Sequence, residues 1–166
     1  MNVKIKQIFQ YLTIPTLLLS IFLLLFSCSG SKKSNNAKAK KEEVMKIAQK
    51  YMGTPYKDGG TTPKGFDCSG YINYVYNKVD LKLPRTTTEL AKTGTAVNMG
   101  SVDKGDLIVF NGSKKKGKKA GHVGIVIGGK NDNLEFIHAS TSKGIMISKL
   151  GEKYFKERLV GFRRIL

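Results

Sequence analysis

The sequence is poor in acidic residues and in cysteine, and it lacks an apolar run of the length that a membrane span usually needs. Only 12 Asp and Glu oppose 29 Lys and Arg, which gives a formal net charge of +17 at pH 7. A length of 166 residues favours one domain and excludes a large multidomain enzyme. Since 40% of the residues are hydrophobic and 25% are charged, the composition is that of a globular chain rather than a disordered one.

The first 27 residues have the pattern of an export signal. Lys4 and Lys6 precede a mostly apolar run over residues 14–26, which is 13 residues long. A membrane span needs about 20 apolar residues, so this run suits the core of a signal peptide better. An uncleaved transmembrane anchor stays open, because the run extends back to residue 8 if polar residues are admitted. Either reading predicts that the remainder is exported.

Residues 25–28, Leu-Phe-Ser-Cys, resemble the lipobox of bacterial lipoproteins, although Phe26 replaces the usual small residue. The resemblance implies cleavage before Cys28 and acyl chains on that cysteine, because more than one chain is required for stable anchoring. A plain signal peptide that happens to end near Cys28 is the alternative. We expect a membrane-anchored lipoprotein that faces the cell wall from the periplasmic side of the outer membrane.

Residues 28–41 would then form the lipidated cysteine and a flexible, Lys-rich tether, since residues 29–41 contain no large apolar side chain. The domain proper is expected over residues 42–166. In an exported protein, its positive charge favours an acidic cell-wall polymer or a membrane surface as partner. A generic solvated surface explains the charge equally well, also in the basic stretch 114–119. No nucleic acid is expected, because no known module of stacking aromatic and basic residues is present.

The periodicity of the domain changes from helical to extended along the chain. Apolar residues at helical spacing predict one helix over residues 42–52 and another that begins at Cys68 with Asp67 as its N-cap. A short helix is expected over residues 87–93. Short β-rich segments follow at residues 107–110, 123–128, 134–138, 145–149 and 159–165. Helices followed by an antiparallel sheet indicate an α+β fold.

Cys68 has the setting of a nucleophile. If Cys28 is acylated, Cys68 is a single thiol, and its position in the first turn of a helix stabilises the thiolate. A buried structural cysteine is the alternative, but the flanking Asp67, Ser69 and Gly70 are not the apolar neighbours that such a residue normally has.

A cysteine nucleophile needs a base, and the chain has only two histidines, His122 and His138. They flank a turn-rich segment, and a hairpin symmetric about Lys130 would place them directly opposite each other, with Cβ atoms about 5 Å apart. One ring would then orient the other, as covalent catalysis requires. A zinc site is the rival interpretation, but one Cys and two His are a thin ligand set, so no metal or cofactor is expected.

The order of these motifs resembles the NlpC-type family of bacterial cell-wall cysteine peptidases over residues 42–166. The matching pieces are Gly53-Thr54-Pro55-Tyr56, Gly59-Gly60, Gly65-Phe66-Asp67-Cys68-Ser69-Gly70, Leu83-Pro84-Arg85-Thr86, Gly105-Asp106-Leu107, His122-Val123-Gly124-Ile125, Phe136-Ile137-His138-Ala139-Ser140 and Arg163-Arg164.

The resemblance implies a papain-like fold, with N-terminal helices packed on a small antiparallel sheet. It also implies that Cys68 is the nucleophile, that His122 is the general base and then acid, and that His138 orients His122. Tyr56 would lie beside the nucleophile at the oxyanion site. Asp67 and Ser69, which flank Cys68, are further candidates for oxyanion or substrate binding.

The expected function is therefore that of a monomeric peptidoglycan endopeptidase that acts on stem peptides. The short domain without a separate wall-binding module favours the cross-link between D-alanine and diaminopimelate. The bond between D-glutamate and diaminopimelate stays open, as do amidase or acyltransferase chemistry and a noncatalytic wall-binding lipoprotein.

Overall fold

The computed structural model describes residues 29–112 and 119–166. The export signal and the lipidated Cys28 lie outside the described residues, as does most of the basic stretch 114–119. The chain divides into two compact units, Met1–Lys38 and Ala39–Leu166. The second unit contains every residue discussed below except the first part of helix α2.

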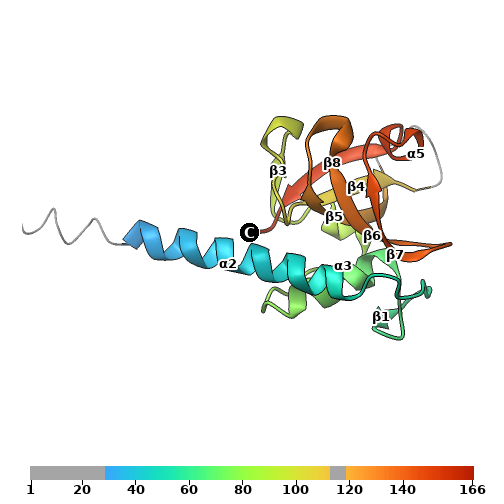
Figure 1. Ribbon diagram of the computed structural model, residues 1–166, viewed down its shortest axis with the longest axis horizontal. Coiled ribbons are helices and arrows are strands. Elements are labelled where there is room, and N and C mark those ends of the chain that lie inside the picture. Colours follow the sequence, from blue (N-terminus) through green and yellow to red (C-terminus); the bar gives the residue numbers. More distant parts are fainter. Residues whose placement is uncertain (1–28, 113–118) are drawn as a thin grey trace, which may run out of the picture. The chain divides into compact units, whose positions relative to one another are not determined.

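An antiparallel sheet of six strands forms the frame of the second unit (Figure 1). Its strand order is β3-β8-β4-β5-β6-β7, so that β8 at the end of the chain lies between β3 and β4. The strands are β3 (Thr95–Val97), β4 (Leu107–Asn111), β5 (Ala120–Gly128), β6 (Glu135–Ser140), β7 (Gly144–Lys149) and β8 (Leu159–Arg164). The short strands β1 (Thr61–Thr62) and β2 (Gly65–Phe66) form a separate pair.

Four α-helices and two 3-10 helices complete the described chain. They are α2 (Ser29–Lys50), α3 (Cys68–Asn77), α4 (Thr87–Leu90), η1 (Met99–Ser101), η2 (Asn131–Asn133) and α5 (Lys153–Lys156). Helices precede most of the sheet, so the predicted α+β class is confirmed. In the part of the chain that the structure describes, no helix has the length and hydropathy needed to cross a bilayer.

The prediction of an unstructured tether over residues 29–41 is wrong, because α2 begins at Ser29 and continues to Lys50. Lysine and alanine, which are frequent in this segment, are good helix formers. Val44 and Ala48 are buried, so the helical turn that carries them is already formed. Further residues extend an existing helix without the unfavourable free energy of nucleation. Within α2, the Lys40 ammonium donates to the carbonyl oxygen of Val79 over 3.0 Å.

The sheet is covered on both faces by apolar side chains. On one face, Val109, Val123 and Ile125 belong to the same cluster as the buried Tyr71 and Ile72 of α3. The alternate residues of the strands form a second cluster that includes the aromatic residues Phe110, Phe136 and Phe155, the last of them from α5. Figure 1 shows α3 and α5 on opposite sides of the sheet. Strands β5 and β6 are therefore held firmly between two cores.

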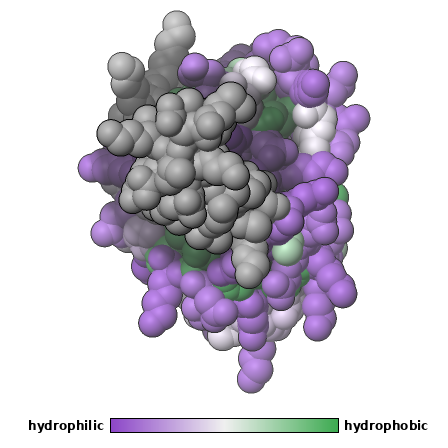
Figure 2. Space-filling model, turned by 90° about the vertical axis from the view of Figure 1, so that its left-hand side faces the viewer, coloured by the Kyte–Doolittle hydropathy of each residue, from purple (hydrophilic) through white to green (hydrophobic). Residues whose placement is uncertain are grey.

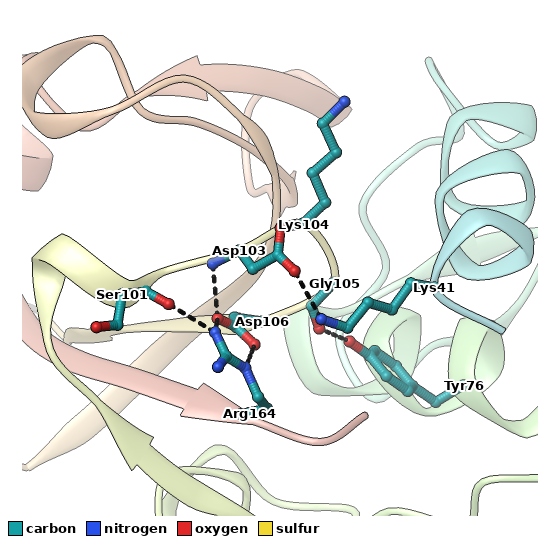
Figure 3. A network of polar contacts seen from close by, with 8 residues as sticks. All are labelled: Lys41, Tyr76, Ser101, Asp103, Lys104, Gly105, Asp106 and Arg164. Atoms are coloured by element: carbon teal, nitrogen blue, oxygen red, sulfur yellow. Dashed lines mark hydrogen bonds and ion pairs between the residues drawn. The ribbon is translucent and has the colours of Figure 1, made fainter. Parts of the chain in front are cut away.

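A polar network ties the end of β8 to the turn before β4 and to α2 (Figure 3). Asp106 is 1% exposed and accepts hydrogen bonds from Arg164 at 2.9 and 2.7 Å. It also accepts the backbone N–H of Asp103, whose own carboxylate pairs with Lys41 at 2.7 Å. Because Lys41 stands on α2, the network fixes that helix to the sheet through side chains far apart in the sequence.

The excess of positive charge lies at the surface. On the part of the surface that Figure 2 leaves uncovered, hydrophilic side chains predominate and hydrophobic ones form only small patches. Among the described residues, the exposed large hydrophobic side chains are Met52, Ile147, Tyr154 and Val160. Of these, Tyr154 is the most exposed, at 55%.

Candidate active site

The thiol of Cys68 lies at the N-terminus of a capped helix, as the sequence predicts. Cys68 is the first residue of α3, and the side chain of the preceding Asp67 accepts the backbone N–H of Gly70 at 2.6 Å. The Cys68 side chain is half-buried, and its Sγ lies 3.6 Å from the hydroxyl of Thr87 on α4. The thiol thus stands at the end of α3 where the backbone N–H groups of the first turn lie.

Asp67 and Ser69 bind each other and Arg85 rather than presenting free polar groups. The guanidinium of Arg85 forms a two-pronged contact with the Asp67 carboxylate and donates to the Ser69 hydroxyl at 2.7 Å. Burial opposes ionisation of Asp67, but the hydrogen bonds from Arg85 and Gly70 outweigh it and lower the pKa of this carboxyl group. The three side chains thus fix the start of α3. The role of Arg85 was not predicted, although it belongs to a motif that the sequence analysis quotes.

Tyr56 lies next to the segment that leads into Cys68. Its backbone pairs in parallel with Phe66, and the amide of Phe66 donates to the carbonyl oxygen of Pro55 at 3.1 Å. Partial burial, and then the proximity of Cys68, raise the pKa of the Tyr56 hydroxyl. The phenol therefore stays protonated at neutral pH and is available as a hydrogen-bond donor close to the sulfur.

His122 and His138 are hydrogen-bonded, but they are not the direct cross-strand pair that the symmetric hairpin predicts. Nε2 of His122 lies 2.9 Å from Nδ1 of His138. The observed register places His138 opposite Gly124, two residues away from the predicted partner. The prediction failed because the connection contains helix η2 and the β5 strand is bulged between Val126 and Gly128, features that a symmetric turn does not have.

A shift of two residues keeps both rings on the same face of the sheet, as diagonal neighbours. Gly124 leaves room for this arrangement. A Cβ atom on Gly124 would come within 2.8 Å of the Phe136 ring and 3.3 Å of the His138 Cβ. Glycine is therefore required at position 124 for steric reasons, which the sequence alone did not reveal.

Ser148 on β7 extends the histidine pair to a third side chain. It is buried, and its hydroxyl lies 3.1 Å from Nε2 of His138. If the His138 Nε2–H donates to Ser148, Nδ1 of His138 accepts from His122, and Nδ1 of His122 is left without a proton. That tautomer is the one in which His122 is able to accept a proton from a thiol. The contact of Ser148 was not predicted, because no local pattern marks a lone serine in a strand.

Both imidazoles are neutral at pH 7. Burial lowers the pKa of His122 to about 4. Burial, and then the nearby charge of His122, lower the pKa of His138 to about 3. A neutral His122 is the form that a general base requires.

Buried neutral His138 predicts a loss of stability on acidification. The unfolded chain takes up the proton near pH 6.5 and the folded chain only near pH 3, so the unfolded state binds more protons between these values. The free energy of unfolding should therefore fall by about 2 kcal/mol between pH 7 and pH 5 through His138 alone. Urea unfolding at the two pH values measures the loss, and His138→Asn should remove that part of it. An equal loss in the variant would contradict the assignment.

Among the described residues no hydrogen bond joins Cys68 to the histidine pair, whose rings contact Phe110, Phe136 and Phe155. Helix α3 packs against β5 and β6, and α4, which carries Thr87, contacts both α3 and β5. Catalytic hydrogen bonds are often long in a free enzyme and shorten when substrate binds. Within residues 29–112 and 119–166, no group of three or more His, Cys, Asp and Glu is placed to hold a metal ion.

Comparison with known proteins identifies the family of this chain. The sequence model of the NlpC/P60 family matches residues 53–164. The chain belongs to the NlpC/P60 family. Its Cys68, His122 and His138 thus lie within the matched domain, and the resemblance given by the motifs is confirmed.

Individual relatives of this NlpC/P60 chain carry cell-wall names. Over 127 residues it is 39% identical to the Escherichia coli K12 protein named murein DD-endopeptidase MepS/murein LD-carboxypeptidase, which covers 76% of this chain and 63% of the relative. The chain thus spans less than two thirds of that relative. Over 157 residues it is 38% identical to a probable endopeptidase NlpC of the same strain, covering 90% of this chain and 97% of the relative.

A solved structure supports the fold. An NlpC/P60 family protein from Bacillus cereus ATCC 10987 superposes with a TM-score of 0.68 at 30% sequence identity. The match covers 75% of this chain and 39% of that protein. The papain-like α+β fold expected from the motifs agrees with this likeness.

Proposed function

We propose that this NlpC/P60 protein is a peptidoglycan hydrolase, a cysteine endopeptidase that cuts stem-peptide bonds. The observation that carries the proposal is the combination of a helix-capped thiol at Cys68 with a neutral His122 held by His138. A pure binding protein needs neither group, and the murein-endopeptidase name of a 39% identical relative supports the substrate class.

The reaction begins with transfer of the Cys68 proton to Nδ1 of His122. The sulfur attacks the peptide carbonyl carbon, and the oxyanion receives hydrogen bonds from the backbone N–H of Cys68 and from the Tyr56 hydroxyl. The C–N bond then breaks as His122 returns the proton to the leaving amine, which leaves a thioester on Cys68. Water deprotonated by His122 attacks the thioester, the C–S bond breaks, and the thiol regains its proton.

The bond that we propose is the cross-link between D-alanine and diaminopimelate. The DD-endopeptidase name of the 39% identical relative supports it. The alternative is the bond between D-glutamate and diaminopimelate within one stem.

Digestion of purified peptidoglycan followed by mass spectrometry tests both the hydrolase activity and the bond that is cut. The wild-type chain should convert cross-linked dimers to intact monomers, and Cys68→Ala should release nothing above background. Truncated stems would move the cut to the D-glutamyl bond. If the two proteins release the same fragments, the hydrolase proposal fails and a wall-binding role replaces it.

We also propose that the chain is exported and anchored by lipid on Cys28, facing the cell wall. The support is the sequence of residues 1–28 alone, which the structure does not describe. Metabolic labelling with a palmitate analogue should mark the full chain and leave Cys28→Ser unlabelled; label on the variant would exclude this anchor.

A further inference from the structure

A cavity of about 600 Å³ opens beside the two histidines. Both His122 and His138 line it, together with Ser148. Its outer walls come from the end of β6 and the turn that follows it (Ser140, Thr141, Ser142 and Lys143) and from α5 with its N-cap (Glu152, Tyr154 and Phe155). Cys68, Tyr56 and Arg85 do not line it.

Because His122 lines the cavity and Cys68 does not, the cavity can be assigned to one side of the scissile bond. Cys68 keeps the acyl part of the substrate as a thioester, whereas His122 delivers the proton to the amine that leaves. A cavity that contains His122 but not Cys68 therefore lies on the side of the leaving amine. The argument rests on the proposed function, because it takes the roles of these two residues from it.

The polar groups of the cavity suit a carboxylate. Lys143 is exposed, and the hydroxyls of Ser140 and Ser142 stand beside it in the same loop, 3.4 Å apart. Both histidines are neutral, and the one acidic residue in the lining is Glu152. An oxygen of the Glu152 carboxylate accepts the backbone N–H of Lys149 at 2.7 Å, so this acid is partly satisfied within the protein.

Tyr154 lines the cavity with an aromatic ring, and Arg158 packs against this ring. The guanidinium of Arg158 lies 3.9 Å from the centre of the Tyr154 ring and donates to the Tyr154 carbonyl oxygen at 3.0 Å. Arg158 is buried, whereas the tyrosine is more than half exposed. An exposed but braced ring is suited to contact the aliphatic part of a bound side chain.

We propose that this cavity binds the leaving half of the cross-link by the free carboxylate on the carbon that carries the leaving amine, with Lys143 as its cationic partner. In diaminopimelate each amino group shares its carbon with a carboxyl group. At the cross-linked end that carboxyl is free, whereas at the end joined to D-glutamate it continues into the peptide as an amide. A carboxylate-binding leaving-group site therefore discriminates in favour of the cross-link.

Steady-state kinetics on two purified cross-linked peptide dimers test this directly. One dimer carries the free carboxylate next to the scissile amide, and the other carries it as a carboxamide. Amidation should raise KM about fivefold for the wild-type chain, as expected for an exposed ion pair. Lys143→Met should raise KM for the free acid by the same factor and should no longer distinguish the two dimers. Lys130→Met, an exposed lysine outside the cavity lining, is the matched control and should behave as the wild type.

A binding measurement keeps this test separate from the test of catalysis. The Cys68→Ala chain, which cannot turn over substrate, is titrated with a stem-peptide monomer whose diaminopimelate has a free amino group and a free carboxylate at one end. Adding Lys143→Met should weaken its binding about fivefold, and rising salt should reduce the difference. If the monomer and its amide bind equally well, or if Lys143→Met leaves binding unchanged, the cavity is not a carboxylate site, whether or not the chain cleaves peptidoglycan.

Discussion

Replacing His122 with alanine should lower kcat/KM for cross-linked peptide dimers by about 10³-fold, because general acid–base catalysis by one group contributes roughly this much. Deprotonation of Cys68 and protonation of the leaving amine both depend on this residue, so kcat should fall rather than KM rise. Adding His122→Ala to Cys68→Ala should cost nothing further, since His122 has no thiol left to activate. Initial rates under saturating and limiting substrate separate the two parameters.

The size of the loss should decrease along the hydrogen-bond relay away from the sulfur. His138→Gln should lower kcat/KM less than His122→Ala does. Ser148→Ala should lower kcat/KM about tenfold, because the serine only favours one tautomer of the His138 ring, which stays in place. Near-UV circular dichroism checks that each variant retains native packing. If His122→Ala kept more than a tenth of the wild-type kcat/KM, His122 would not be the base. If a correctly folded Ser148→Ala variant lost as much kcat/KM as His122→Ala, the effect would not decrease along the relay.

Local patterns predicted the parts of the site that depend on local structure. The Asp67 cap and the position of Cys68 in the first turn of α3 follow from a few neighbouring residues, and the structure has both. The same holds for the class of the fold, because the change from helical to strand periodicity is visible along the chain. The extent of α2 was underestimated for the opposite reason, since its N-terminal half has no apolar stripe and is recognised only from the propensity of Lys and Ala.

Contacts between distant segments were not predictable from these patterns. The hairpin correctly suggested that His122 and His138 meet, but its register depended on a bulge and on the helical turn η2, which composition does not specify. Arg85 and Ser148 reach the site across different elements, and nothing in their immediate sequence shows which group they contact. The candidate catalytic residues were thus easier to find than the residues that hold them in place.

Replacing Asp106 with alanine should lower the free energy of unfolding by about 2–3 kcal/mol, because it removes a buried acceptor of several hydrogen bonds, two of them from a charged group. The carboxylate is 1% exposed and receives two hydrogen bonds from Arg164 and one from the backbone of Asp103. Its loss would leave a partly buried guanidinium and a backbone N–H without their acceptor, at the point where β8 meets the turn before β4.

Asp103 offers the matched control, because it belongs to the same network but its side chain is 57% exposed. Asp103→Ala removes the exposed ion pair with Lys41 and the hydrogen bond from the Lys104 backbone N–H, so it should cost about 1 kcal/mol, and less at high salt. Urea unfolding of both variants at pH 7, with similar slopes, gives the comparison. If the two substitutions destabilise the protein equally, burial does not set the strength of this network. In that case the Gly105-Asp106-Leu107 motif needs a reason other than the anchoring of Arg164.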